Sequence, residues 1–104
     1  MANEAKLSHT AALILQAISS GSIYGLSVME RTGLPSGTVY PALRRLERAG
    51  LILGTWDEAS GRRRRVYELT PAGARMLAAE RGSWRQFAAA VTALLEPASG
   101  PAAP

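Results

Sequence analysis

The fold of this chain is decided by one stretch of its sequence, Gly37-Thr38-Val39-Tyr40-Pro41-Ala42-Leu43-Arg44-Arg45-Leu46-Glu47-Arg48-Ala49-Gly50-Leu51-Ile52. Wound as a helix at about 100° per residue, the stretch places a narrow apolar stripe on one face: Val39, Leu43 and Leu46. The opposite face carries three arginines that suit phosphate neutralisation and contact with guanine edges: Arg44, Arg45 and Arg48. We therefore predict a basic helix, about Ser36–Ala49, that packs by one face and inserts the other into DNA. The alternative is a basic face that only meets solvent.

Pro41 is unusual inside this helix, because an internal proline removes a backbone hydrogen bond and typically costs about 3 kcal/mol. Near the first helical turn the cost is smaller, but it still suggests a purpose beyond helix formation. We hypothesise that Pro41 makes a compact apolar contact with the methyl group of a thymine. Ser36, at the start of the same helix, is a further candidate DNA contact.

The residues before the basic helix predict a helix-turn-helix. Residues Tyr24–Arg31 form a short helix with Leu26 and Met29 on one side, and we assign both side chains to the core. In the turn that follows, Gly33 is available as the left-handed residue that ends a helix, and Ser36 as the N-cap of the next one. Two helices joined by a short turn that contains glycine are typical of this DNA-binding unit.

The residues after the basic helix predict a β-hairpin, the wing of a winged helix. Leu51–Trp56 is rich in strand formers, Asp57–Gly61 is a turn segment, and Arg62–Leu69 returns as a second strand. The returning strand begins with four arginines that can reach a minor groove or flanking phosphates, and three of them are our candidate DNA contacts: Arg62, Arg63 and Arg64. The alternative is a charged edge strand that discourages aggregation. Four consecutive arginines are more than edge protection requires.

The positive charge of the chain is concentrated in this region. The 104 residues include 12 Lys and Arg against 8 Asp and Glu, which gives a formal net charge of +4 and a pI near 10.3. Seven arginines and three acidic residues lie between Arg44 and Arg65, so this segment alone carries the whole excess. A basic patch on an otherwise balanced chain is typical of nucleic-acid binding.

The inventory of chemical groups argues against an enzyme. The chain has no cysteine, a single histidine (His9), no paired carboxylates at a useful spacing and no phosphate-binding glycine loop. We therefore expect no catalysis, no cofactor and no metal site. No apolar run approaches the roughly 20 residues of a membrane span, and no signal-type segment begins the chain. We expect one domain, no membrane partner and a cytoplasmic location.

Two further helices are predicted to hold the DNA-reading unit. The first, about Ser8–Ser19 with Ser8 as its N-cap, is apolar around most of its circumference, which suggests that a partner chain covers it. The last begins with Thr70 as N-cap and Pro71 at its first position, and it runs to about Leu95. It is too long for its own domain to cover, so we expect it to pair with the same helix of a second subunit.

The predicted dimer interface consists of large apolar residues from these two helices: Leu13, Ile14, Ile18, Leu77, Trp84, Phe87, Val91 and Leu94. On the last helix they fall at three-, four- and seven-residue spacings, which indicates a weak coiled-coil-like seam. Gly82 destabilises a helix interior by about 1 kcal/mol, which makes a kink there one possibility. The other is that the helix continues through it.

These motifs resemble those of the PadR family of winged helix-turn-helix regulators. The resemblance covers about residues 8–95 and is carried by Tyr24-Gly25, Gly37-Thr38-Val39-Tyr40-Pro41-Ala42-Leu43-Arg44-Arg45-Leu46-Glu47, Gly50-Leu51-Ile52, Gly61-Arg62-Arg63 and Tyr67-Glu68-Leu69-Thr70-Pro71-Ala72-Gly73. The resemblance implies a homodimeric transcriptional repressor of the compact subgroup with a single C-terminal helix. It also implies that Tyr40 contacts the DNA backbone, that Thr38 and Arg44 lie in the major groove, and that the wing arginines touch the flanking groove.

Trp84 has two competing interpretations. In some compact, multidrug-responsive members of the family, a tryptophan at the corresponding place meets its symmetry mate and sandwiches flat aromatic ligands. Trp84 and Phe87 would then form an effector site. In the other interpretation, Trp84 anchors the dimer interface with no ligand, because tryptophan suits buried interfaces anyway. Trp56 is more simply a packing residue of the wing or the core.

The sequence thus predicts a mainly α fold with a small β-hairpin. Its parts are an N-terminal tail (1–7), a winged helix-turn-helix DNA-binding domain (8–69), a long C-terminal dimerisation helix (70–96) and a disordered tail (97–104). We expect a homodimeric repressor that binds double-stranded DNA at a pseudo-palindromic operator and is released by a small aromatic or hydrophobic effector. The alternatives are a constitutive DNA-binding protein without an effector and a winged-helix module that contacts protein or RNA.

Overall fold

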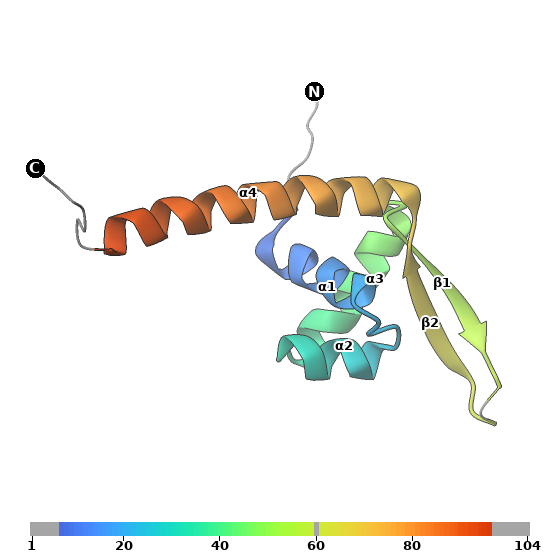
Figure 1. The fold of residues 1–104 in the computed structure, drawn as a ribbon. Coiled ribbons are helices and arrows are strands. Elements are labelled where there is room, and N and C mark those ends of the chain that lie inside the picture. Colours follow the sequence, from blue (N-terminus) through green and yellow to red (C-terminus); the bar gives the residue numbers. More distant parts are fainter. Residues whose placement is uncertain (1–6, 60, 97–104) are drawn as a thin grey trace, which may run out of the picture.

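A computed structural model describes residues 7–59 and 61–96 (Figure 1). Its elements follow one another in the order α1 (His9–Ser19), α2 (Gly25–Thr32), α3 (Ser36–Arg48), β1 (Ile52–Asp57), β2 (Arg64–Leu69) and α4 (Pro71–Leu95). The predicted mainly α fold with a β-hairpin and a long last helix is confirmed. The predicted disordered tail at 97–104 and all but the last residue of the predicted N-terminal tail lie outside the described residues.

The core forms where the first three helices meet, and the hairpin and the start of α4 close it. Its most deeply buried large side chains are Ile14, Leu15, Val28, Val39, Leu43, Ile52 and Leu77. The predicted inner face of α3 is confirmed, because Val39, Leu43 and Leu46 are all buried. Each such side chain contributes about 1.5 to 3 kcal/mol by leaving water, so this apolar stripe fixes the orientation of α3.

Local signals at the helix ends explain most of the boundaries. The Ser8 hydroxyl accepts the N–H of Ala11 at 3.1 Å, and the Thr70 hydroxyl accepts the N–H of Gly73 at 3.1 Å, so both predicted N-caps are confirmed. Gly33 ends α2 with φ of 76°, the predicted left-handed conformation. These caps set the starts of α1 and α4 and the end of α2.

The prediction for the start of α3 was wrong by one residue. The N-cap is Pro35, with extended backbone at φ −76° and ψ 160°, and Ser36 is the first helical residue. The Pro35 carbonyl accepts the N–H groups of Thr38 and Val39 at 2.9 and 3.0 Å. Because proline fixes φ and has no N–H to leave unpaired, a helix can begin directly after it without a side-chain cap.

Leu26 also departs from its prediction. It was assigned to the core, but 59% of its surface is exposed, whereas Met29 is partly buried against the core as expected. In α2 only Gly25 and Val28 are buried, because this short helix contacts the rest of the body along a single narrow line. The first turn of α2 therefore leaves the Leu26 side chain at the surface.

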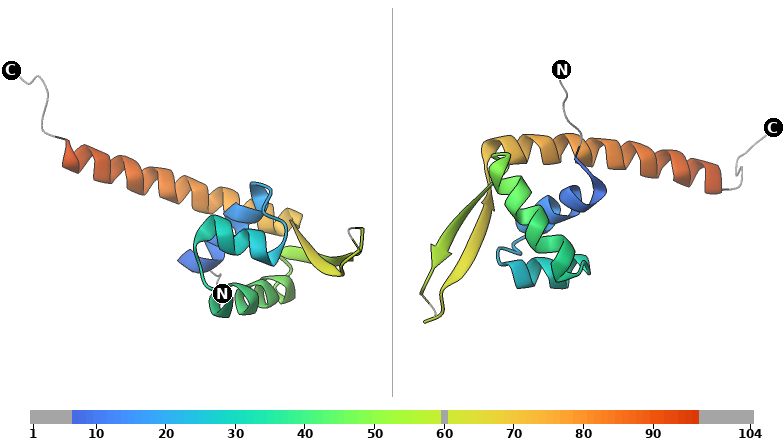
Figure 2. Two further views of the ribbon diagram at one scale, coloured as in Figure 1. Left: turned by 90° about the horizontal axis from the view of Figure 1, so that it is seen from below. Right: turned by 180° about the vertical axis from the view of Figure 1, so that it is seen from behind.

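The hairpin is a twisted two-stranded antiparallel sheet that leaves the body beside α3 (Figures 1 and 2). Its register pairs Ile52 with Leu69 at the base and Asp57 with Arg64 near the tip. At the base, the Tyr67 N–H donates to the Ile23 carbonyl at 2.9 Å. This bond ties the wing to the segment between α1 and α2.

The last helix, α4, runs without a break through Gly82, so the chain adopts the continuous form of the two that were expected. Its start is pressed against the body, since a side chain at Gly73 would overlap the Leu51 carbonyl. Farther along, Arg81 donates to Gln16 at 2.9 Å and to Ser19 at 3.0 Å. The C-terminal half of α4 projects away from the body (Figures 1 and 2).

Candidate nucleic-acid interface

The outer face of α3 presents its polar side chains to solvent. Ser36, Tyr40, Arg44, Arg45 and Arg48 are exposed, and Thr38 and Pro41 are half-buried. Because Pro41 lacks an N–H, the Gly37 carbonyl loses its usual partner inside the helix. The exposed face thus offers cationic donors, which suit phosphates and the acceptor edge of guanine.

The three arginines of α3 do not share one direction. Arg44 and Arg48 are four residues apart and lie on the same side of the helix. Arg45 is turned about 100° away from Arg44, and it lines a different hollow with Leu7 and Met76. The structure therefore places Arg44 and Arg48 together on the outward face and sets Arg45 toward the side of α1 and α4.

The wing arginines alternate between the two faces of the hairpin, as successive strand residues must. The guanidinium groups of Arg63 and Arg65 lie 4.2 and 5.1 Å from the centroid of the Trp56 ring, and that of Arg64 lies 4.0 Å from the Tyr24 ring. These distances are within the range of cation–π attraction. No such stacking partner is recorded for Arg62, which leaves it the most freely directed of the four within the described residues.

Two ion pairs further distinguish the wing arginines. Arg65 donates to the Glu47 carboxylate of α3, and both side chains are only about one-third exposed, at 31% and 28%. Arg63 lies 3.5 Å from Glu58, but these side chains are 62% and 69% exposed, so water and salt screen their attraction. Arg65 is therefore committed to holding the wing against α3, whereas Arg63 remains free to exchange partners.

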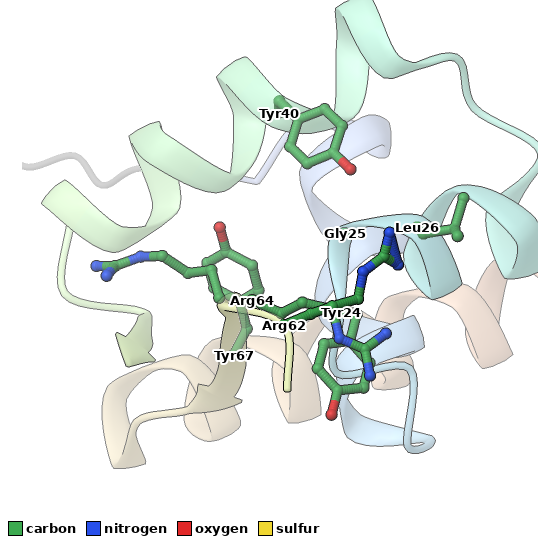
Figure 3. A pocket seen from close by; sticks show the side chains of 8 residues that line it. Tyr24, Gly25, Leu26, Tyr40, Arg62, Arg64 and Tyr67 are labelled. Carbon is green, nitrogen blue, oxygen red and sulfur yellow. The ribbon is translucent and has the colours of Figure 1, made fainter. Parts of the chain in front are cut away.

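A hollow of about 190 Å³ lies between the wing, α3 and the first turn of α2 (Figure 3). It is lined by Tyr24, Gly25, Leu26, Tyr40, Arg62, Arg64, Arg65 and Tyr67. The ring of Tyr40 lies directly on Gly25, where a side chain would overlap it. Tyr40 and Tyr67 direct their hydroxyl groups into the hollow, with Arg62 and Arg64 at its other end (Figure 3). Cationic and hydroxyl donors gathered in this way suit a phosphate group.

Two ionisable groups at this site have shifted pKa values. Burial raises the pKa of Tyr67 above its usual value of 10.0, which extends the pH range over which its hydroxyl stays protonated and can donate. The pKa of Asp57 lies below its usual 3.8. The main cause is the hydrogen bond that its carboxylate accepts from the Ala59 N–H, and the second is the one that it accepts from the Tyr24 hydroxyl. The Tyr24–Asp57 bond, 3.1 Å long, joins the wing to the start of α2.

The residues predicted for a dimer interface separate into two groups. Ile14, Ile18 and Leu77 are buried in the core of this chain, at 0%, 5% and 1% exposure. The prediction for these three is corrected, because they have almost no surface left to offer a partner. Leu13, Phe87 and Leu94 are exposed, and Trp84 and Val91 are half-buried.

Sequence reasoning missed the contacts of three residues that position the wing: Tyr24, Glu47 and Arg65. The strand period alone indicates that alternate arginines face opposite sides. It does not indicate their partners, because the hairpin register that sets Trp56 opposite Arg65 is a property of the folded sheet. Trp56 itself, which was expected to pack in the wing or core, is 53% exposed and covered by arginines of the wing.

Three packed helices, with a short turn between the second and third and a β-hairpin after them, define a winged helix-turn-helix, a class of DNA-binding domain. Residues 14–79 match the family model described as the transcriptional regulator PadR-like family. The chain belongs to this family of DNA-binding transcriptional regulators.

Individual relatives agree with this assignment. The chain is 44% identical over 52 residues to a transcriptional regulator of Mycobacterium tuberculosis, a match that covers 50% of this chain and 49% of that protein. The chain thus matches about half the length of that relative. A PadR family regulator from Clostridium difficile has a similar structure, with TM-score 0.75 and 28% identity, over 86% of this chain and 100% of the other. A PadR-like regulator from Bacillus cereus gives 0.74 and 29%, over 84% and 91%.

Within residues 7–59 and 61–96, no helix combines the length and the apolar character that crossing a membrane requires.

Proposed function

We propose that this chain acts as a homodimeric repressor that binds a pseudo-palindromic operator in double-stranded DNA. Each subunit would insert α3 into a major groove and place its wing on the flanking groove and phosphates. One observation carries the proposal: the chain has two different exposed surfaces. One is basic and lies on α3 and the wing; the other is apolar and lies on the projecting half of α4. The first surface fits DNA, and the second fits another copy of the chain.

The projecting half of α4 supports the homodimer. Phe87, Leu94 and Leu95 are 72%, 85% and 76% exposed, although they are large and apolar. The radius of gyration is 17.7 Å, whereas a compact chain of about 100 residues has about 13 Å, so the helix extends well beyond its own body. Large apolar side chains gathered on one exposed element are typical of an interface, and two copies related by a two-fold axis would cover each other.

The two-fold axis gives the expected form of the operator. Two copies of α3 that enter one face of the duplex must lie about 10 base pairs, or a multiple of that, apart. The operator would therefore contain two inverted half-sites with this spacing. Because Arg44 and Arg48 share the outward face of α3, we expect them to make the contacts closest to the bases. Arg45, Ser36, Thr38, Tyr40, Pro41 and the wing residues Arg62, Arg63 and Arg64 complete the proposed contact surface.

We further propose that a small aromatic or hydrophobic effector controls DNA binding. Trp84 is half-buried at the point where α4 leaves the body, and Phe87 lies exposed one helical turn farther along. In a dimer these two aromatic residues would lie near their symmetry mates and could enclose a flat aromatic molecule. Binding there would change the angle between the paired helices and move the two copies of α3 out of register.

Selection of bound duplexes from a random DNA library tests the proposal. We expect the unaltered chain to enrich inverted half-sites and to sediment as a dimer at micromolar concentration. Leu94→Glu would place a charge on the exposed apolar face, so this variant should sediment as a monomer and lose affinity for the paired site at least tenfold. Arg75→Ala, on an exposed residue of α4, is the matched control and should do neither.

Two results would count against parts of this proposal. A monomeric unaltered chain that still binds the selected site with full affinity would contradict the dimer. No binding to any duplex at low salt would favour a module that contacts protein or RNA. Titration with a broad panel of planar aromatic compounds separates an effector-controlled repressor from a constitutive one. It is followed by fluorescence in a Trp56→Phe variant, whose remaining tryptophan is Trp84.

A further inference from the structure

We propose that Trp56 is a positioning residue for DNA binding: its indole ring holds the guanidinium groups of Arg63 and Arg65 in the orientation in which the wing meets DNA. This inference rests on the proposed function of the chain as a DNA-binding regulator and assigns a task within it. It concerns a side chain that contacts both arginines: Arg65, which holds the wing against α3, and Arg63, which contacts the duplex in the proposed function.

The surroundings of Trp56 do not fit those of a core residue. Its side chain is 53% exposed, and it does not belong to the residues that form the core or pack against it. What it contacts is charge, since guanidinium groups lie 4.2 and 5.1 Å from its ring centroid. Among the aromatic side chains, the indole ring of tryptophan attracts cations most strongly. We therefore infer that this large exposed aromatic residue orients the two arginines that it contacts.

The contact with Arg65 links Trp56 to the recognition helix. Arg65 lies over the indole ring and also pairs with Glu47 of α3. Gly54 makes room for this arrangement, because a side chain there would lie 2.9 Å from Arg65 Nε and 3.0 Å from Glu47 Oε1. The chain of contacts from the indole ring through the guanidinium group to the carboxylate fixes the direction of the wing relative to α3.

The contact with Arg63 determines which wing cation faces DNA. Arg65 is neutralised by Glu47, whereas among the described residues the carboxylate that pairs with Arg63 is the screened and exposed Glu58. When a phosphate replaces Glu58, the indole ring still restricts the rotamers of Arg63. A side chain that is ordered before binding loses less conformational freedom when it binds. Trp56 therefore raises affinity without adding a contact of its own.

The salt dependence of binding distinguishes a positioning residue from a contact residue. The slope of log affinity against log salt counts the phosphates that the protein neutralises, about 0.9 for each in B-DNA. Trp56→Leu leaves every arginine in place, so we expect affinity to fall about fivefold with the slope unchanged, as loss of an exposed cation–π contact implies. Arg63→Ala removes a contact, so its slope should also fall, by about one for each subunit.

The experiment measures fluorescence anisotropy with a labelled duplex that the unaltered protein selects from a random library, at several salt concentrations. Trp56→Phe keeps an aromatic face and should retain most of the affinity. Leu53→Ser is the matched control, because Leu53 is also a large residue on β1, at 49% exposure, and lies on the opposite face of the strand. It should bind as the unaltered protein does.

A second measurement needs no DNA. In the unaltered protein, ring currents of the indole should shift the side-chain NMR signals of Arg63 and Arg65, and Trp56→Leu should return them to ordinary positions. Unshifted arginine signals, or unchanged affinity of Trp56→Leu while the unaltered protein binds, would overturn this inference alone. A slope lost together with the affinity would also overturn it, since that result indicates a collapsed wing. No DNA binding by the unaltered protein would overturn the proposed function itself.

Discussion

The recognition helix and the wing both carry arginines, but they hold them in different ways. In α3 the backbone does the positioning, because a buried apolar stripe fixes the helix and its period turns Arg44 and Arg48 outward. In the wing, side chains hold side chains: two aromatic rings and one carboxylate cover Arg63, Arg64 and Arg65. A two-stranded hairpin has little core of its own, so its charges need local partners to keep one direction.

The largest expected effect on stability comes from a substitution in the core beneath α3. Leu43 is 1% exposed in the middle of α3. Leu43→Ala should lower the free energy of unfolding by about 2 to 5 kcal/mol, because it leaves a cavity under the recognition helix. Trp56→Ala, in the wing, should cost less than about 1 kcal/mol, as expected for an exposed side chain away from the core. Urea denaturation at one fixed protein concentration measures both. Equal losses would show that the wing carries core packing after all.

The next effect concerns the outward face of α3. Replacing both Arg44 and Arg48 by alanine should weaken operator binding by at least about thirtyfold, since each good base contact contributes about 1 to 3 kcal/mol and two are removed. Arg45→Ala should have a smaller effect, because Arg45 lies toward α1 and α4. Titration at fixed salt tests this order. A larger loss for Arg45→Ala than for Arg44→Ala would contradict the assignment of the outward face.

A smaller effect should follow from disturbing the ion pair between wing and helix. Gly54→Ala would place a methyl group 2.9 Å from Arg65 Nε, so the Arg65 or Glu47 side chain must shift and their ion pair is disturbed. We expect a stability loss of about 1 kcal/mol and a fall in operator affinity, with the core of α3 intact. Thermal unfolding measures the stability loss, and amide hydrogen exchange shows whether that loss lies in the wing or in α3. Exchange that speeds up in β1 and β2 and not in α3 would support the separation of the two regions.

The smallest expected effect lies at the tip of the wing. Asp57 has a lowered pKa, so it favours the folded state above its unfolded pKa, and that contribution disappears as pH falls through the folded pKa. Tyr24→Phe removes one of the hydrogen bonds that lower it. The pKa of Asp57, followed by carboxyl NMR titration, should rise toward 3.8 in this variant but stay below it, because the larger cause, the Ala59 N–H, remains. A pKa that does not move would remove Tyr24 from the support of the wing.

The sequence predicted those features that depend on neighbours along the chain. The apolar stripe of α3, the caps at Ser8 and Thr70 and the turn at Gly33 follow from helical period and backbone preference. The start of α3 was misplaced because Ser36 resembles a cap, although Pro35 fills that position.

Features that depend on distant contacts could not be predicted in this way. Glu47 and Arg65 are 18 residues apart, and Tyr24 and Asp57 are 33 apart. Ile14, Ile18 and Leu77 were assigned to a partner chain because an apolar helix surface looks the same whether its own body or a second copy covers it. Only the packing of α1 under α4 decides between these possibilities.

The uninterrupted passage of α4 through Gly82 has a mechanical consequence. Arg81 clamps this helix to α1 on one side of Gly82, and the projecting segment begins on the other. The segment from Trp84 to Leu95 extends about 17 Å at 1.5 Å per residue. Because α4 is continuous and fixed to the body at one end, a small rotation of its free end turns the whole body with it. The arginines lie far from that end, so they move farther than the end itself does.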